Sequence, residues 1–127
     1  MGVTYDTGAL VAGERNDRRM WAIHAELLAL EIAPTVPAPV LAQAWRGGAR
    51  QASLVRLLRQ CGVEDMTEAH AKEVGLVAGS SGSSDVVDVA VVVGARRRRD
   101  SAIVTADPDD LRAIAEAAAF AVHLEVV

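Results

Sequence analysis

The chain has 127 residues, 51% of them hydrophobic, and carries a formal net charge of −4 from 13 Lys and Arg against 17 Asp and Glu. This length predicts one domain over residues 1–127, with enough apolar side chains for a sizeable core. The negative charge excludes a protein that binds nucleic acid through overall positive charge. Any contact with nucleic acid must therefore come from a local patch.

The cysteine count and the apolar runs favour a cytoplasmic protein without a membrane partner. Cys61 is the single cysteine, so no internal disulfide forms and a reducing compartment fits best. The N-terminal residues 1–6 lack the basic and apolar regions of a signal peptide. The longest apolar run, residues 86–95, is interrupted by Asp88 and is shorter than the roughly 20 residues of a membrane span.

Short apolar segments alternate with amphipathic patterns along the chain. The expected strands are residues 2–5, 102–105 and 121–127, and residues 33–37 form a short strand or an extended linker. The expected helices are residues 9–11, 18–30, 39–46, 51–61, 67–78, 85–96 and 108–119, with a flexible loop at 79–84. This alternation predicts an α/β protein, a three-layer sandwich with a mostly parallel central sheet.

Two of the expected strands end at aspartates, Asp6 and Asp107. Ligands of parallel sheets gather beyond the carboxyl ends of strands, so these two side chains converge if their strands are neighbours. Asp85 and Asp88 are three residues apart and share one face of an otherwise apolar helix. Carboxylates in one pocket repel each other, and oxygen ligands favour Mg²⁺ or Mn²⁺ as the ion that relieves the repulsion.

Each of these residues also has a structural interpretation. Asp6, Asp85 and Asp107 each precede an expected helix and are suited to capping it. Asp109 and Asp110 complement the positive start of the last helix, and we interpret both as structural. Asp88, inside an apolar helix, is the hardest of the acids to explain by structure alone.

Three segments resemble the PIN-domain family and, within it, the VapC-type toxins. They are the opening strand and helix at residues 3–12, the acidic helix at 85–95, and the late strand with its acids at 103–111. The resemblance covers essentially the whole length of the chain. Each segment is weakly specific, but their order and spacing together match the family pattern.

The resemblance implies an endoribonuclease that depends on Mg²⁺ or Mn²⁺ and is the toxin of a toxin–antitoxin pair. It implies that Asp6, Asp88 and Asp107 ligate or orient the metal, with Asp85 beside them. It also implies a PIN-like fold, a homodimer, and a cognate antitoxin whose tail plugs the active site. The hypothesis for the chemistry is phosphodiester hydrolysis assisted by the bound cation.

One position departs from the family pattern. Gln43 occupies the place where the family usually has a glutamate on the helix after the second strand. An amide brings no charge, so the site loses one carboxylate and metal affinity is expected to fall. Glu14, at the end of the first helix, is a candidate replacement, with a solvated helix-end glutamate as the alternative. A degenerate module that binds RNA or a protein without cutting is the competing function.

Contact with RNA requires positive charge near the acids. Arg46, with Arg50 nearby, is a candidate substrate-binding residue, and the run at 96–99 is either an RNA contact or a set of cations at a helix C-terminus. Thr105 is expected to hydrogen-bond a ligand or phosphate, or else to pack within its strand.

Other functions have weaker support in the sequence. A phosphotransferase with a nucleophilic Asp6 lacks the second acid two residues later, because Gly8 stands there. No glycine-rich nucleotide-binding motif is present. Three histidines, His24, His70 and His123, lack metal-ligand spacing and are interpreted as structural.

Overall fold

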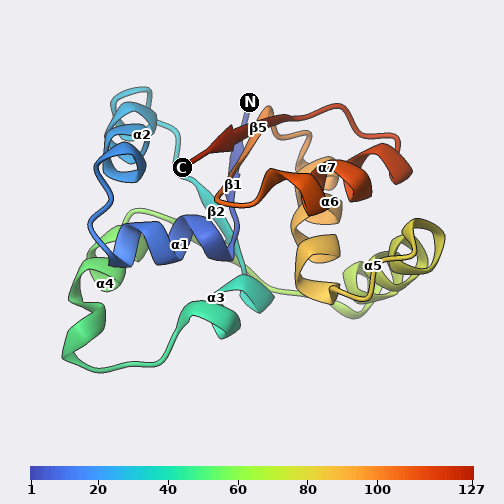
Figure 1. The fold of residues 1–127 in the computed structure, drawn as a ribbon, viewed down its shortest axis with the longest axis horizontal. Helices are drawn as coiled ribbons and strands as arrows, with labels where there is room; N and C mark the ends of the chain where they lie inside the picture. The colour runs from blue at the N-terminus through green and yellow to red at the C-terminus, as the bar shows by residue number, and fades with distance from the viewer.

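The computed structural model describes residues 1–127 as a five-stranded sheet with helices on both faces (Figure 1). The strands are β1 (Val3–Tyr5), β2 (Thr35–Pro37), β3 (Gly62–Glu64), β4 (Ala102–Thr105) and β5 (His123–Val126). They lie in the order β3-β2-β1-β4-β5, and every pair is parallel. The predicted fold class, an α/β sandwich around a parallel sheet, is confirmed.

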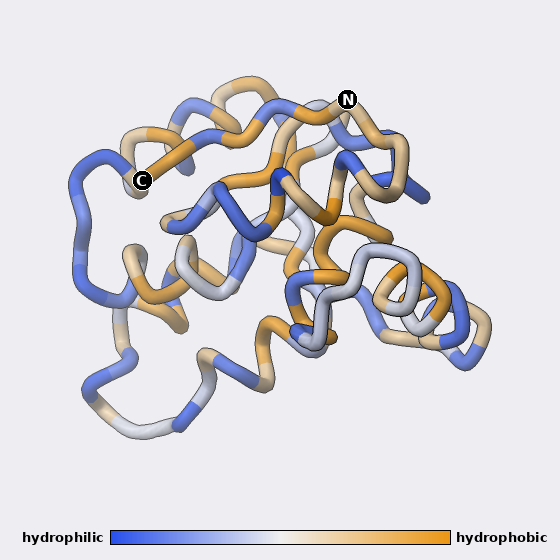
Figure 2. The backbone as a smooth tube through the Cα atoms, turned by 45° about the vertical axis from the view of Figure 1, so that its right-hand side comes forward, coloured by the Kyte–Doolittle hydropathy of each residue, from blue (hydrophilic) through white to orange (hydrophobic).

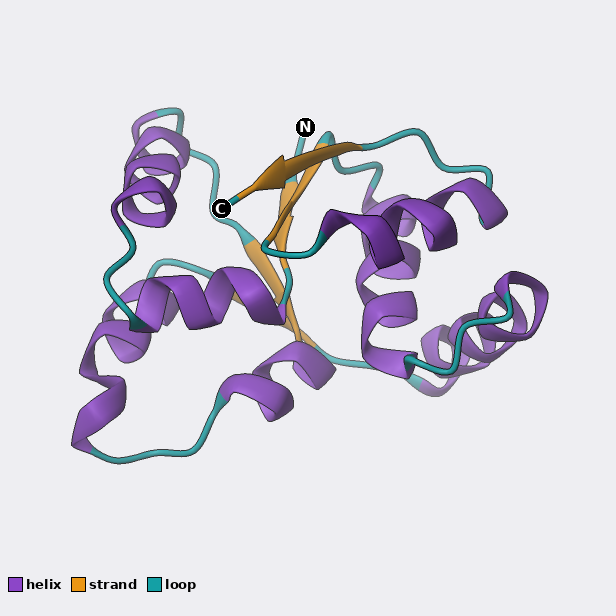
Figure 3. Cartoon of the chain, viewed as in Figure 1, coloured by secondary structure: helices purple, strands orange, loops and turns teal.

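Helices cover the sheet in two groups. The helices are α1 (Thr7–Glu14), α2 (Arg18–Ala29), α3 (Ala38–Ala44), α4 (Ala52–Leu58), α5 (Glu68–Ser81), α6 (Val86–Arg98) and α7 (Pro108–Ala117), with a 3₁₀ turn at Ala49–Gln51. Helices α1 to α4 lie on one side of the strands, and α5 to α7 lie on the other (Figures 1 and 3). The helical connections therefore switch from one face of the sheet to the other between the neighbouring strands β1 and β4.

The core is made of small aliphatic side chains packed between these layers. Helix α6 is the central element, because every residue from Val89 to Ala95 is buried. In β1, Val3, Thr4 and Tyr5 are also buried. Figure 2 shows hydrophobic stretches running through the interior and hydrophilic ones on outer loops. No single helix is long and apolar enough to cross a membrane, and only α5 and α6, bent by 112°, pass such a test as a pair.

Several expected helix starts are confirmed by their capping hydrogen bonds. The Asp17 side chain accepts from the N–H of Met20 at 2.8 Å, and the Thr67 hydroxyl accepts from that of His70 at 3.2 Å. These bonds satisfy backbone donors that have no partner within the helix. The strand at 102–105 also has the predicted bounds.

One strand was not predicted, and one local prediction was wrong. Residues 62–64 form the edge strand β3, although no apolar run predicts a strand there. Gly62 and Val63 are exposed, and the strand is stabilised by its pairing with β2. The expected flexible loop at 79–84 is partly helical, because α5 continues to Ser81 and ends at Gly82 with a φ of +70°. Glycine adopts that left-handed conformation without strain.

Candidate active site

Asp6 lies at the carboxyl end of β1 and begins helix α1. Its Oδ1 accepts a hydrogen bond from the N–H of Ala9 at 2.9 Å, and only 6% of the residue is exposed. Strand β1 pairs with β2 on one side and β4 on the other, and the helices that follow β1 and β4 cover opposite faces of the sheet. Such a reversal opens a crevice at the carboxyl ends of the strands, where α/β proteins bind ligands.

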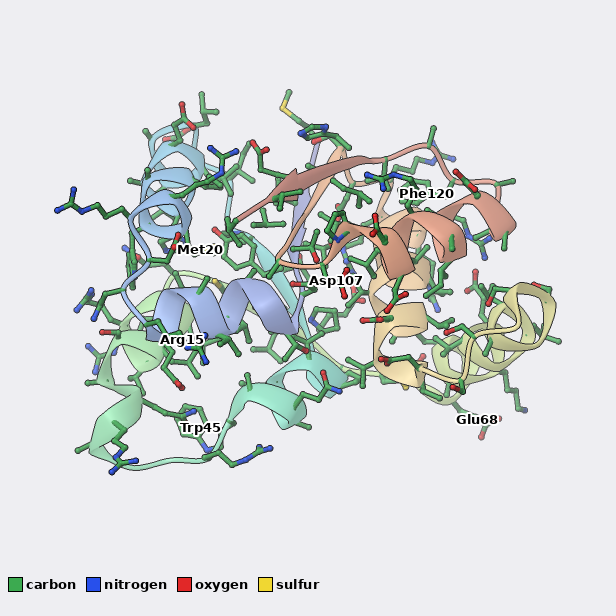
Figure 4. All side chains as sticks on the ribbon, viewed as in Figure 1. Arg15, Met20, Trp45, Glu68, Asp107 and Phe120 are labelled. Carbon is green, nitrogen blue, oxygen red and sulfur yellow. The ribbon has the colours of Figure 1, made fainter.

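Gly8 brings the start of α1 against the loop that follows β4. A Cβ atom on Gly8 would lie 2.8 Å from the Cβ of Ala106 and 3.0 Å from its backbone nitrogen. Only glycine permits this approach without a shift of the neighbouring backbone. Because Asp107 follows Ala106 directly, this contact sets how far Asp107 lies from Asp6 (Figure 4 labels Asp107).

Thr105 links these two acids. It is fully buried, its hydroxyl accepts from the N–H of Asp107 at 3.0 Å, and its side chain opposes the rise in the pKa of Asp6. The Asp107 carboxylate makes no capping hydrogen bond to α7, so it remains available to a ligand. Thr105 was predicted to hydrogen-bond a ligand or phosphate, or else to pack within its strand. Its hydroxyl contacts the backbone of Asp107, and a ligand contact stays a prediction.

The other two predicted acids come from the start of α6. Asp85 caps the helix by accepting from the N–H of Asp88 at 3.0 Å. Burial first, and then the negative charges of Asp85, Asp6 and Asp110, raise the pKa of Asp88 from 3.8 to about 6. Burial also raises the pKa of Asp6, with a contribution from Asp107, although hydrogen bonds to its carboxylate oppose the rise. These acids from three elements therefore act on one another electrostatically.

Asp110 joins this group, although its sequence context suggested only a structural role. It lines a hollow of about 350 Å³ together with Asp85, Asp88 and the serine-rich segment 81–84. The signal was its spacing of three residues from Asp107, the same spacing as between Asp85 and Asp88. Asp109, in contrast, is exposed and pairs with Arg112 at 3.1 Å, as a structural residue does.

No cationic side chain compensates the acidic group. We define this group, the site acids, by five residues: Asp6, Asp85, Asp88, Asp107 and Asp110. None of them takes part in an ion pair, whereas carboxylates elsewhere, such as Glu73 and Asp100, are paired with arginines. Oxygen donors with uncompensated charge fit a hard divalent cation, and the pKa values of two of them, Asp6 and Asp88, are raised.

The spacing of the site acids limits how they would hold such an ion. No group of three or more Asp, Glu, His or Cys side chains is arranged to hold a metal. Mg²⁺ typically retains several waters and binds through one or two carboxylates together with substrate phosphates. Asp6 and Asp88 are the two carboxylates best suited to bind such an ion. Both have raised pKa values, and the charge of another site acid contributes to each rise.

Gln43 and Glu14 lie in different places relative to these acids. Gln43 is exposed near the start of α1, where its Oε1 accepts from the hydroxyl of Thr7 at 2.5 Å. Glu14 is at the other end of α1, about 10.5 Å along the helix axis from Thr7. It accepts from Gln51 at 2.6 Å, and Gln51 also binds the backbone at Ala44. The geometry thus gives Glu14 a structural contact instead of a place among the site acids.

The predicted RNA-binding arginines are also engaged in the structure. Arg46 is exposed and folds back on its own helix, with Nη1 2.6 Å from the carbonyl oxygen of Trp45. At the far end of α6, Arg96 pairs with Glu73 at 2.6 Å, and Arg98 pairs with Asp100 at 3.2 Å. These pairs favour the helix-terminus interpretation of the run at 96–99 over contact with RNA.

No protein-family model matches the sequence, and no curated protein matches it significantly. Two solved structures are similar. The VapBC2 structure from Rickettsia felis, bound to a DNA fragment from its promoter, has a TM-score of 0.72 and 16% identity over 100% of this chain and 99% of that chain. Mycobacterium tuberculosis VapC20, described as a sarcin-ricin loop cleaving toxin, has a TM-score of 0.61 and 21% identity over 94% and 97%.

The chain has the fold of the VapC toxins. This confirms the PIN-like fold that the sequence resemblance implied. In this VapC-like fold, the acids that follow β1 and β4 and those that begin α6 belong to one edge of the sheet.

Proposed function

We propose that the chain is a metal-dependent endoribonuclease and the toxin of a type II toxin–antitoxin pair. The observation that carries the proposal is the set of site acids, which lies at the carboxyl edge of a VapC-like sheet without any compensating cation. The description of VapC20 as a sarcin-ricin loop cleaving toxin supports RNA as the substrate class. Mg²⁺ or Mn²⁺ is the cofactor that suits these oxygen ligands.

The proposed roles follow from burial and contacts. Asp6 and Asp88 hold the metal, which when bound activates water and stabilises the charge of the scissile phosphate. Asp107, which follows the neighbouring strand β4, orients the ion from beside Asp6. Thr105 orients Asp6 through its hydroxyl, and Asp85 and Asp110 accept hydrogen bonds from waters around the site.

Two partners belong to this proposal, a cognate antitoxin and a second copy of the chain. The R. felis neighbour is a VapBC2 structure, which supports the antitoxin. An apolar surface supports the homodimer; it is lined by Ala38, Leu41, Ala42, Trp45, Leu58 and Val63. Trp45 is 45% exposed there, and Figure 4 shows it on the outer segment after α3. Exposed aromatic patches of this kind are typical of protein interfaces.

The direct test is cleavage of a structured RNA by the purified protein in Mg²⁺ or Mn²⁺, compared with EDTA. We expect cleavage only with the metal, and a loss of at least about 100-fold in rate for Asp6→Asn. Asp109→Asn is the matched control, because Asp109 is an exposed aspartate outside the site acids. Metal-dependent cleavage that is equal in both variants would reject the proposed site.

A second candidate function is favoured by Gln43. A site with one carboxylate fewer than the family pattern, and without three preformed ligands, suits a module that binds RNA or protein without cutting. A calorimetric titration separates the two functions. Binding of Mn²⁺ in the micromolar to low millimolar range supports the nuclease, whereas no binding at millimolar Mn²⁺ supports the binding module.

A further inference from the structure

A second hollow lies along α1, on the other side of the contact between Gly8 and Ala106. We call it the α1 groove and define it by the residues Thr7, Gly8, Val11, Ala12, Arg15 and Ala106, which are part of its lining. Its volume is about 410 Å³, within the range of small-molecule sites. None of the site acids lines it, so it is distinct from the hollow beside Asp88.

The α1 groove adjoins the site acids directly. Two residues that line the groove are sequence neighbours of site acids: Thr7 follows Asp6, and Ala106 precedes Asp107. Figure 4 labels Asp107 near the start of α1 and Arg15 at the other end of the helix. A polymer that presents one phosphate to the acids therefore has its next unit beside the groove.

The groove has one free cation, Arg15. This exposed side chain makes no ion pair and no hydrogen bond, whereas nearby Arg19 pairs with Glu125 at 3.2 Å. The acid that also lines the groove, Asp17, already uses its carboxylate to cap α2 through Met20. Arg15 is about 12 Å along the helix from Thr7, so it suits a phosphate beyond the one at the acids.

The floor of the groove is formed by small apolar side chains. Val11 and Ala12 lie between Thr7 and Arg15 on one stripe of α1, and both are partly exposed. Small aliphatic side chains leave room for a flat ring above them, and their surface suits the face of a base. A phosphate-binding cation next to an apolar shelf is the chemistry of single-stranded nucleic acid recognition.

We propose that the α1 groove binds the nucleotide adjacent to the scissile phosphate of single-stranded RNA. The base packs on Val11 and Ala12, and Arg15 contacts the phosphate that follows. This inference rests on the proposed ribonuclease function and assigns Arg15 a role in substrate binding. The competing occupant is a peptide segment of a protein partner, which would not require the charge of Arg15 to meet a phosphate.

The test measures binding of a fluorescein-labelled, single-stranded RNA hexamer by anisotropy, in EDTA to prevent cleavage. We expect Arg15→Gln to weaken binding about fivefold and to reduce the slope of log affinity against log salt by about one. Ala12→Phe, which fills the groove without changing charge, is expected to weaken binding similarly. Arg18→Gln is the matched control, because Arg18 is exposed and unpaired but does not line the groove.

The outcomes separate this inference from the proposed function. Equal RNA affinity and equal salt slope for Arg15→Gln and Arg18→Gln would overturn the inference, as would undiminished RNA binding by a folded Ala12→Phe. Thermal melting establishes that each variant is folded. Absence of metal-dependent RNA cleavage by the wild type would reject the nuclease, while the binding measurement would still decide whether the groove takes RNA.

Discussion

Gly8 lies so close to Ala106 that a Cβ atom on Gly8 would stand 2.8 Å from the Cβ of Ala106. This contact joins the start of α1 to the loop after β4, and so it joins the two strand ends that carry Asp6 and Asp107. The arrangement of the site acids therefore depends on a residue with no side chain.

We predict that Gly8→Ala destabilises the protein by about 1–3 kcal/mol, because the added methyl group forces the two segments apart. Cleavage of RNA should fall with it as Asp6 and Asp107 separate. The control is Gly75→Ala in α5, where a Cβ meets nothing within 4 Å. That substitution should stabilise by up to about 1 kcal/mol through helix propensity. Equal stabilisation by both substitutions would contradict the close contact.

Asp88→Asn should stabilise the metal-free protein in a way that depends on pH. The folded-state pKa of about 6 exceeds the ordinary value of 3.8, so the folded state binds more protons between these values. Stability should therefore fall as the pH rises from about 4 to about 6, and then level off. The full shift corresponds to about 3 kcal/mol, which partial exposure reduces to about 1–2 kcal/mol.

Thermal melting of wild type and Asp88→Asn in EDTA at pH 4 and pH 7 checks this prediction. The variant should melt several degrees above the wild type at pH 7, and the difference should shrink at pH 4. Asp109→Asn, which removes a paired and exposed carboxylate, should show no such gain at pH 7. A difference that is the same at both pH values would argue against the raised pKa.

Thr105→Val tests whether the hydroxyl positions Asp6. The substitution keeps the branched shape but leaves the N–H of Asp107 without its acceptor. We expect metal affinity or cleavage rate to fall about 10- to 100-fold, as is usual when a group that orients a ligand is removed. Thr105→Ser, which retains the hydroxyl, should recover most of the activity. No recovery with Ser would indicate that the methyl group matters and the hydrogen bond does not.

Gln43→Glu should strengthen metal binding, since it adds a carboxylate near the start of α1. An acceptor oxygen for the hydroxyl of Thr7 is retained, so the local contact survives. We expect the affinity for Mn²⁺ to rise about tenfold or more, because ligand charge governs the affinity of such sites. Glu14→Gln, at the other end of α1, should leave it unchanged. A larger effect from Glu14→Gln would give Glu14 the role that its contact with Gln51 argues against.

The positions of the strands that carry acids, and of most of the acids themselves, could be predicted from local sequence. Asp6 and Asp107 each follow a short apolar strand, and the rule that parallel strands share a carboxyl edge places them together once β1 and β4 are neighbours. The neighbouring position itself is a tertiary property. It depends on packing around α6, whose uniformly buried run from Val89 to Ala95 does not indicate which strands it will cover.

The features that sequence reasoning missed depend on long-range contacts. Strand β3 has exposed residues and exists because β2 offers it backbone partners. The sequence left the run at 96–99 either as an RNA contact or as cations at a helix C-terminus. It gave no sign of Glu73, which lies 23 residues before Arg96 and pairs with it between α5 and α6. Asp110 was missed although its spacing from Asp107 was visible, because a helix start explains an acid equally well.

The most direct test of the central claim is anomalous X-ray diffraction from crystals soaked in Mn²⁺. We expect an anomalous peak between the carboxylates of Asp6 and Asp88, next to Asp107. We also expect that peak to be lost in Asp6→Asn crystals. A well-ordered site with no anomalous density at millimolar Mn²⁺, or a peak away from these side chains, would contradict it.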